Sequence, residues 1–254
     1  MMTTVRAAAR RARDLARSTG SVTVERGPAS GLRLGRRYAS ADYRLGTNEG
    51  PLQQALVEHL STGDVFYDIG SNVGFFTLIG ARLVGREGSV HAFEALAGCA
   101  RALRRNVARN DFANVTVHEC AVGAHVGDVP LMVSRHPGGA TISVADRPHN
   151  EVRTVTVHVT TLDAVVAAGA PMPDLVKIDV EGAELDVLRG AGDVLQRARP
   201  TVIYEVDDAD HDRARAKAAS LADHLRERGY ETQPLEASYG GSRSLVLHHL
   251  AVAR

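Results

Sequence analysis

The segment VFYDIGSNVGFFTLIG, residues 65–80, constrains the fold more than any other part of the sequence. An apolar run of strand length ends around Asp68 and passes through Gly70 and Gly74 directly into an apolar run of helical length. Glycines at such a junction let the backbone approach a ligand closely, and the helix that follows presents unpaired amide donors. The segment therefore predicts a strand, a tight turn and a helix, with a ligand at the turn.

Strand-like and helix-like runs alternate on both sides of this unit. Helices are expected near residues 51–61, from residue 74, at 97–110 and at 210–229, and strands at VFYDIG, SVHAFE, VTVHECA, DLVKIDV and PTVIYEV. This alternation indicates right-handed β-α-β units and a mostly parallel sheet that helices cover on both faces. The final runs, YETQPL and SRSLVLHHLAVAR, are expected to pair as an antiparallel edge of the sheet.

Three segments depart from the alternation. Residues 136–169 begin as a polar, glycine-rich loop and continue as an alternating strand near 153–159 and a short helix. Residues 20–45 contain two short alternating runs around a Gly/Pro turn, which predict a small hairpin. Residues 4–18 have the composition of an arginine-rich helix ahead of the main fold.

The amino-acid composition limits the kinds of binding partner that are expected. Thirty basic and thirty acidic residues give a formal net charge of zero, and aromatic residues make up 4% of the chain, with no Trp. Neither nucleic acid nor a large stacking platform is therefore expected. No run approaches the ~20 apolar residues of a membrane span, and Cys99 and Cys120 form no metal-ligand pattern, so a cytoplasmic protein with two reduced thiols and no membrane partner is expected.

A second acid supports a cofactor at the glycine turn. The run SVHAFE ends in Glu94, twenty-four residues after Gly70, where a carboxylate can accept hydrogen bonds from both hydroxyls of a ribose. The G-x-G-x-x-G pattern of dinucleotide-binding proteins is broken, because Asn72 and Phe75 stand where its second and third glycines would be. A dinucleotide is therefore disfavoured.

The turn D-x-G-x-N-x-G resembles the first motif of the class I S-adenosylmethionine-dependent methyltransferases. Six ordered blocks, FYDIGSNVGFFTL, GSVHAFEA, NVTVHECAVG, TLDAVV, LVKIDVEGAELDVLRGA and RPTVIYEV, resemble the FkbM family over about residues 48–206. The resemblance implies a Rossmann-like α/β fold with a mostly parallel seven-stranded sheet. It also implies methyl transfer, usually to a hydroxyl of a sugar, polyketide or related secondary metabolite. We accordingly divide the chain into an N-terminal helix and hairpin extension, 1–45, and a methyltransferase domain, 46–254.

The resemblance also implies which residues bind S-adenosylmethionine. The amino-acid end of the cofactor would lie against the glycine turn, the ribose against the acid that ends the second strand, and the adenine against the turn after the third strand. The cofactor-binding residues expected on this basis are Glu49, Asp68, Gly70, Ser71, Asn72, Gly74, Glu94, Ala95, Cys120, Ala121 and Asp179.

Acids at the ends of two later strands are the candidates for catalysis. Ligands of a doubly wound sheet bind outside the carboxyl ends of its strands, which is where Asp179, Glu181 and Glu205 are expected. Either one of them acts as the general base for a hydroxyl acceptor, or the three hold a Mg²⁺ ion. Glu184 fits a capping role in the next helix, and Lys177 either pairs with an acid of the site or packs within the sheet.

Other ionisable residues have less specific expectations. His248 and His249 alternate faces on the last strand, where surface exposure is expected. Asp207 and Asp208 either precede a solvated helix start or add a metal ligand. Alternative bases flank the irregular stretch, at His136, His149 and His158.

The sequence favours an S-adenosylmethionine-dependent O-methyltransferase that acts on a small hydroxylated molecule. Two alternatives stay open at this point: a non-catalytic scaffold that keeps the cofactor, and a nucleotide-dependent oxidoreductase. The sequence does not reveal the acceptor, nor whether the chain forms a homo-oligomer.

Overall fold

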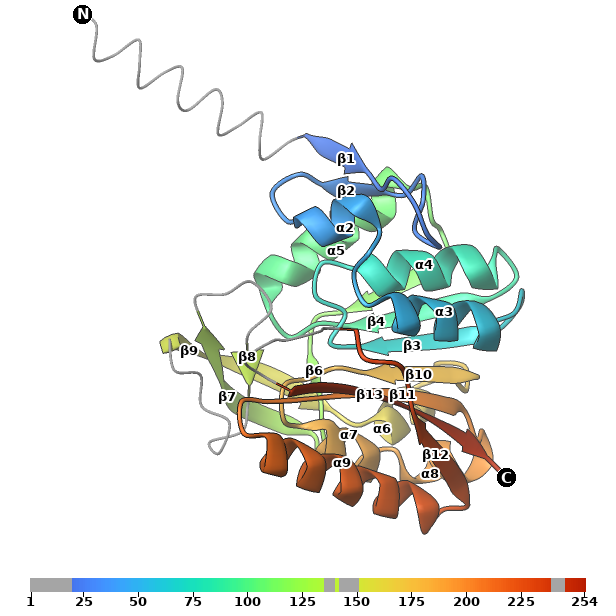
Figure 1. Ribbon diagram of the computed structural model, residues 1–254, viewed down its shortest axis with the longest axis vertical. Coiled ribbons are helices and arrows are strands. Elements are labelled where there is room, and N and C mark those ends of the chain that lie inside the picture. The colour runs from blue at the N-terminus through green and yellow to red at the C-terminus, as the bar shows by residue number, and fades with distance from the viewer. Residues whose placement is uncertain (1–19, 135–139, 142–150, 239–244) are drawn as a thin grey trace, which may run out of the picture.

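A seven-stranded sheet forms the centre of the molecule (Figure 1). The computed structural model describes residues 20–134, 140–141, 151–238 and 245–254. The strands of the central sheet lie in the order β12-β13-β11-β10-β3-β4-β5. Their bounds are β3 Val65–Ile69, β4 Ser89–Phe93, β5 Val115–His118, β10 Leu175–Ile178, β11 Thr201–Asp208, β12 Tyr230–Pro234 and β13 Leu245–Ala253.

Strand direction in this sheet is parallel except at β13. Strand β10 pairs in parallel with β3 and β11, and β4 does so with β3 and β5, whereas β13 is antiparallel to both β11 and β12. The predicted mostly parallel seven-stranded sheet is confirmed. One detail differs, because β12 takes the edge and the final strand lies inside the sheet. The backbone of β13 therefore pairs with a neighbouring strand on each side.

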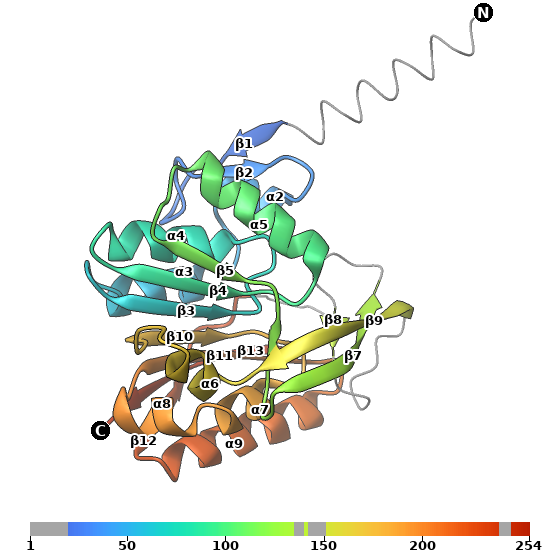
Figure 2. The same cartoon turned by 180° about the vertical axis from the view of Figure 1, so that it is seen from behind.

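Helices cover both faces of the sheet, as Figures 1 and 2 show. Each face has its own core of buried apolar side chains. None of the described helices has the length and apolar character that a membrane crossing requires. One face carries α3 Gly50–His59, α4 Phe75–Val84 and α5 Ala97–Arg109, and the other carries α6 Leu162–Ala167, α7 Glu184–Arg189, α8 Gly192–Arg197 and α9 His211–Arg226.

Helix α9 shows how the local sequence sets such an element. The Asp210 side chain caps its start by accepting hydrogen bonds from the backbone N–H groups of Asp212 and Arg213, at 3.0 and 3.1 Å. Apolar residues recur at helical spacing and form its buried face, at Ala214, Ala218, Leu221 and Leu225. The acidic run before α9 therefore forms the start of this helix, which was one of its two expected roles; the other was to add a metal ligand.

The N-terminal segment packs onto the first helical face. It contains the predicted hairpin, formed by β1 (Ser21–Thr23) and β2 (Arg33–Gly35), followed by the short helix α2 (Ala41–Leu45). Leu32 and Leu34 are buried in the same core as the side chains of α3 and α4. The helix predicted at 4–18 lies outside the described residues, and the division of the chain at residue 45 stays a prediction.

A second sheet lies beside the carboxyl ends of the central strands. Its order is β6-β9-β7-β8, and its strands are β6 Ala121–Val122, β7 Gly127–Ser134, β8 Ala140–Thr141 and β9 Glu151–Thr160. Sequence reasoning predicted β9 but missed β7, whose Gly127 and Pro130 are typical of turns. Among the described residues, β8 pairs with Met132 and Val133 and not with Pro130, and a proline is tolerated where its nitrogen has no ladder partner.

Asn106 of α5 connects the hairpin to the glycine turn. Its buried side-chain oxygen accepts a hydrogen bond from the Gly35 N–H at 2.8 Å, and its side-chain nitrogen donates one to the Val73 carbonyl at 2.8 Å. Replacing Asn106 with Ala leaves both backbone groups without these partners, and such losses cost about 1 to 3 kcal/mol. We expect the Asn106→Ala variant to lose about 2 kcal/mol in its free energy of unfolding, measured by urea denaturation.

The matched control is Arg105→Ala, which truncates an exposed side chain on the same helix. It should change the free energy of unfolding by less than about 0.5 kcal/mol. Equal urea midpoints for the two variants would show that Asn106 does not fasten the hairpin.

Candidate active site

In the turn between β3 and α4, every second residue from Gly70 to Gly74 has a left-handed backbone conformation. Gly70, Asn72 and Gly74 have left-handed φ values of 75°, 49° and 92°. Glycine and asparagine enter this region most readily, which accounts for the G-x-N-x-G spacing. A Cβ atom on Gly70 would lie 1.7 Å from the carbonyl oxygen of Asp179, and one on Gly74 would lie 2.2 Å from Leu103. The turn is therefore held close to the end of β10.

Glu94 closes the other side of this turn. One carboxylate oxygen accepts a hydrogen bond from the Asn72 N–H at 2.9 Å, and the other accepts one from the Leu96 N–H at 2.7 Å. Each oxygen keeps a lone pair for another donor. The side chain is 9% exposed, and burial raises the pKa of Glu94 to about 7 against the two backbone hydrogen bonds, which lower it. The carboxylate is thus oriented toward the turn and available to a pair of hydroxyl groups.

The remaining predicted cofactor residues lie around this pair. The Ser71 hydroxyl donates to the Phe93 carbonyl at 3.1 Å, so it fastens the turn to β4. The Glu94 N–H donates to the His118 carbonyl, which ties the end of β4 to the end of β5, shortly before Cys120 and Ala121. Burial raises the pKa of the Cys120 thiol to about 11, so this thiol is neutral at ordinary pH.

A buried ion network lies behind the turn. The Lys177 ammonium is 3.3 Å from an Asp68 oxygen and 3.2 Å from an Asp179 oxygen, and it lies over the Phe76 ring. The Thr77 hydroxyl donates to the other Asp68 oxygen at 2.5 Å. Burial alone would lower the pKa of Lys177, but the charges of Asp179 and Asp68 raise it above its ordinary value. Lys177 therefore pairs with acids of the site, which decides between its two expected roles.

Asp68 faces the core in this arrangement. Its side chain is 0% exposed and both of its oxygens contact Thr77 or Lys177. Its direct contact with a cofactor, expected from the family resemblance, stays a prediction. In the structure it holds the end of β3 and the start of α4 together.

Asp179, Glu181 and Glu205 come to the same end of the sheet. Burial raises the pKa of Asp179, and the Lys177 charge opposes this shift. Burial, followed by the charges of Asp179 and nearby acids, raises the pKa of Glu181 to about 8. Glu184, the first residue of α7, accepts a hydrogen bond from the Gly182 N–H at 2.8 Å, so its role is structural: it fastens the loop before the helix and does not cap the helix itself.

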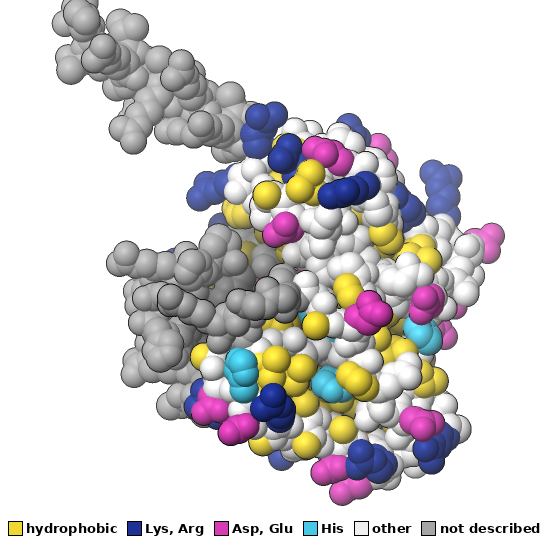
Figure 3. All heavy atoms as spheres, viewed as in Figure 1, with side chains coloured by type: hydrophobic (Ala, Val, Ile, Leu, Met, Phe, Trp, Pro, Cys, Tyr) yellow, Lys and Arg dark blue, Asp and Glu magenta, His cyan; other side chains and the backbone are white. Residues whose placement is uncertain are grey.

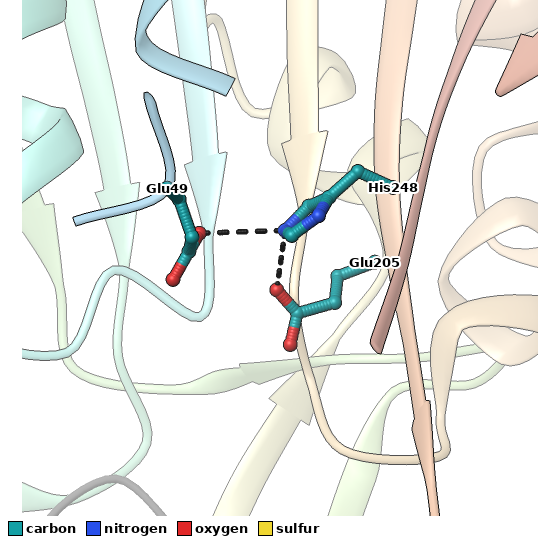
Figure 4. A group of neighbouring side chains, drawn as sticks. All are labelled: Glu49, Glu205 and His248. Carbon is teal, nitrogen blue, oxygen red and sulfur yellow. Dashed lines mark ion pairs between the residues drawn. The ribbon is translucent and has the colours of Figure 1, made fainter. Parts of the chain in front are cut away.

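A second cluster joins Glu205 to two residues from distant parts of the chain, Glu49 and His248 (Figure 4). The Nε2 atom of His248 lies 2.7 Å from a Glu205 oxygen and 3.4 Å from a Glu49 oxygen. Burial alone would lower the pKa of His248, but these two contacts raise it to about 9. The expected surface exposure of His248 is wrong, because β13 lies inside the sheet and leaves this residue 3% exposed.

The Mg²⁺ ligand set predicted from the sequence does not form a close group. In the part of the chain that the structure describes, the residues whose ligand atoms lie within 4.8 Å of one another are Glu49, Glu205 and His248. Asp179 instead contacts Lys177 at 3.2 Å. Only Glu205 is common to both sets.

Tyr43 of α2 was not predicted as a site residue. Its ring stacks on Phe75, with centroids 4.6 Å apart. Burial, together with the charges of Glu49 and Asp179, raises the pKa of its hydroxyl above the ordinary value. No periodic pattern in the hairpin segment pointed to it.

Other candidates lie elsewhere. His158 is exposed and 3.1 Å from Asp128 on the second sheet, and the other two proposed histidine bases, His136 and His149, lie outside the described residues. Asp208 accepts hydrogen bonds from Arg213, which lowers its pKa. Asp208 therefore stabilises the start of α9 instead of offering a free metal ligand.

Comparison with known protein families agrees with these features. The family model described as "Methyltransferase FkbM domain" matches residues 68–232, from the glycine turn through α9 and into β12. The chain belongs to the FkbM methyltransferase family. This FkbM methyltransferase is thus an enzyme that transfers methyl groups, and the non-catalytic and oxidoreductase alternatives are set aside.

Two relatives show the range of the family. The chain is 32% identical over 179 residues to "31-O-demethyl-FK506 methyltransferase FkbM" of Streptomyces tacrolimicus, covering 59% of this chain and 68% of the relative. It is 30% identical over 151 residues to "Hexuronic acid methyltransferase AglP" of Haloferax volcanii, covering 58% of each chain. The match therefore spans just over half of AglP.

Solved structures confirm the Rossmann-like methyltransferase fold. The methyltransferase FkbM of Methylobacillus flagellatus superposes with a TM-score of 0.53 at 15% identity, over 78% of this chain and 50% of that one. SMU.1697c of Streptococcus mutans, a putative methyltransferase solved in complex with SAH, gives 0.50 at 9% identity, over 79% of this chain and 94% of that one.

The close approach of Gly70 to Asp179 gives a direct test of the site. An Ala at this position combines a left-handed φ of 75° with a Cβ atom 1.7 Å from a backbone oxygen, so the turn must move. We expect Gly70→Ala to lose at least about 2 kcal/mol in its free energy of unfolding. Urea denaturation would measure the loss.

Gly98→Ala provides the control, since no atom lies within 4 Å of its added Cβ and the residue is in helix α5. That change should stabilise the protein by up to about 1 kcal/mol. A Gly70→Ala variant as stable as Gly98→Ala would contradict the described turn.

Proposed function

We propose that the enzyme binds S-adenosylmethionine at the glycine turn and transfers its methyl group to a hydroxyl oxygen of a small molecule. The observation that carries this proposal is the pairing of Glu94 with the Asn72 N–H. It puts a buried carboxylate beside a turn whose backbone has no room for side chains at Gly70 and Gly74. A ribose would meet Glu94, and the amino-acid end of the cofactor would meet the turn.

The reaction requires one proton to leave the acceptor. The hydroxyl oxygen attacks the methyl carbon, the bond between that carbon and the sulfonium breaks, and its electron pair stays on sulfur. The products are a methyl ether and S-adenosylhomocysteine. Because an alcohol is a weak acid, a nearby carboxylate that accepts its proton accelerates the transfer by roughly 10² to 10⁴.

Glu181 is the best placed general base among the three predicted acids. Asp179 is held by Lys177, and Glu205 contacts His248. No hydrogen bond or ion pair joins the Glu181 side chain to another described residue. Its backbone has a left-handed φ of 54°, a conformation that costs about 1 to 2 kcal/mol in a residue with a side chain and that clusters at functional sites.

The acceptor proposed is a hydroxylated sugar or a glycosylated or polyketide metabolite. The names of two relatives support this class, since one is a hexuronic acid methyltransferase and the other acts on 31-O-demethyl-FK506. The face in Figure 3 has Lys and Arg side chains over the N-terminal hairpin and again along its lower edge, where Asp and Glu side chains lie beside them. The acid-rich site itself disfavours a polyanion such as nucleic acid.

Calorimetric titration with S-adenosylhomocysteine tests the cofactor site, and its pH dependence tests Glu94. Ribose hydroxyls donate to the ionised carboxylate, whose pKa is about 7 in the free protein. Affinity should therefore rise about tenfold between about pH 6 and about pH 8. The unliganded protein should show the opposite trend. Ionising this buried acid costs stability, so its contribution is greatest below its ordinary pKa and is lost as pH rises through about 7.

Glu94→Gln supplies the comparison for both measurements. It should bind S-adenosylhomocysteine more weakly than the wild type at about pH 8, with little change in affinity between the two pH values. NAD serves as the negative ligand. Undiminished, pH-dependent binding by the variant would remove Glu94 from the cofactor site.

Glu181→Gln tests the proposed base. Turnover of a hydroxylated acceptor, found by screening hexuronic acids and glycosylated polyketides with a labelled methyl donor, should fall roughly 100-fold or more. Affinity for S-adenosylhomocysteine should not change. Asp186→Asn, an exposed acid on the adjacent helix α7, should keep full turnover. Equal turnover in the two variants would transfer the role of base to another acid.

A further inference from the structure

The cluster of Glu49, Glu205 and His248 has features that the methyl-transfer step does not explain. Glu205 and His248 are directly opposite each other on paired strands β11 and β13, so the sheet register fixes their approach. Glu49 arrives from the segment before α3, with a left-handed φ of 46°. Three separate elements thus converge on one point at the end of the sheet (Figure 4).

The imidazole of His248 points toward the carboxylates of Glu49 and Glu205. Its side chain is 0% exposed, and its Nδ1 atom faces the Ser238 hydroxyl at 3.4 Å, which directs Nε2 toward the two carboxylates. Nε2 lies close to both acids, yet neither contact has the direction of an N–H hydrogen bond. A histidine that binds a metal through one ring nitrogen usually has its other nitrogen held by a second group, as Ser238 holds Nδ1 here.

We propose that Glu49, Glu205 and His248 bind one divalent transition-metal ion, of the Mn²⁺ or Zn²⁺ class. Ligand atoms at about 2.1 Å from an ion lie about 3.0 to 3.4 Å from one another. The contacts of 2.7 and 3.4 Å around Nε2 are close to that spacing. A ligand set of one imidazole and two carboxylates favours these ions over Mg²⁺ and Ca²⁺, which prefer oxygen alone.

The surrounding charges fit such an ion. Lys177 interacts electrostatically with both glutamates, but its charge is offset by direct contacts with Asp68 and Asp179. A divalent ion would balance the negative charge that the two glutamates bring to this enclosed point. The glutamate side chains are 11% and 16% exposed, so the site is enclosed yet open to a small ligand.

Three protein ligands leave coordination positions free. Resting on the proposed function, we assign one of these positions to the acceptor hydroxyl. A metal-bound hydroxyl loses its proton more readily, with the electron pair of the O–H bond kept on oxygen and the proton passed to Glu181. The ion would thereby select acceptors that offer oxygen ligands, such as neighbouring hydroxyls of a sugar.

Direct metal binding tests the site independently of turnover. The full chain is treated with EDTA, dialysed and titrated with MnCl₂, while the electron paramagnetic resonance signal of free Mn²⁺ is followed, and with ZnCl₂ by calorimetry. We expect one ion per chain, bound at least about tenfold more weakly by His248→Gln and by Glu205→Gln. His158→Gln, an exposed histidine on β9, should bind as the wild type does.

Titration of each variant with S-adenosylhomocysteine keeps the two proposals separate. Metal binding lost in His248→Gln and Glu205→Gln, with S-adenosylhomocysteine binding retained, supports the site. Should His248→Gln fail to fold, Glu205→Gln decides alone. Metal binding that is absent in the wild type, or unchanged in both variants, overturns the metal site and leaves the cofactor proposal intact. Failure of the wild type to bind S-adenosylhomocysteine would overturn the proposed function instead.

Discussion

The buried ammonium of Lys177 is the interaction on which the rest of the site depends. It is 2% exposed, and its contacts join β10 to the end of β3 through Asp68 and to the start of the following loop through Asp179. Removing one partner of such a network leaves a buried charge, which costs about 3 to 5 kcal/mol, so the three residues must be kept together. Their positions in turn fix Thr77 at the start of α4 and the carbonyl of Asp179 against Gly70. Charge pairing thus holds the glycine turn in place.

The same region concentrates backbone strain. The described residues other than glycine with left-handed φ values include Asn72, Glu49 and Glu181, which all lie at the end of the central sheet. This conformation costs about 1 to 2 kcal/mol at Glu49 and Glu181, whereas asparagine adopts it more readily. The surrounding sheet and its ion pairs offset this cost and hold the backbone of each of these residues in one conformation.

The fold and the glycine turn could be predicted from sequence because they depend on local patterns. Strand and helix periods, the spacing of Gly70 and Asn72, and the distance to Glu94 are all readable along the chain. His248, Tyr43 and β7 could not be found in this way, since each depends on pairing between distant segments. His248 is buried because β13 enters between β11 and β12, and the sequence does not show which of the last two strands takes the edge. The Mg²⁺ set failed for a related reason, because Lys177 turns toward Asp179.

The position of β13 also has a consequence for the order in which the protein is assembled during translation. This strand pairs with β11 although it follows every other strand of the central sheet along the chain. Until it is synthesised, β11 presents an unpaired edge, which is open to pairing with other chains. Glu205 and Glu49 likewise have no contact with His248 until this strand is made. The contact between His248 and Glu49 joins residues that are far apart in the sequence. The nascent protein can therefore form its glycine turn early, but this ionic cluster comes together only when the final strand enters the sheet.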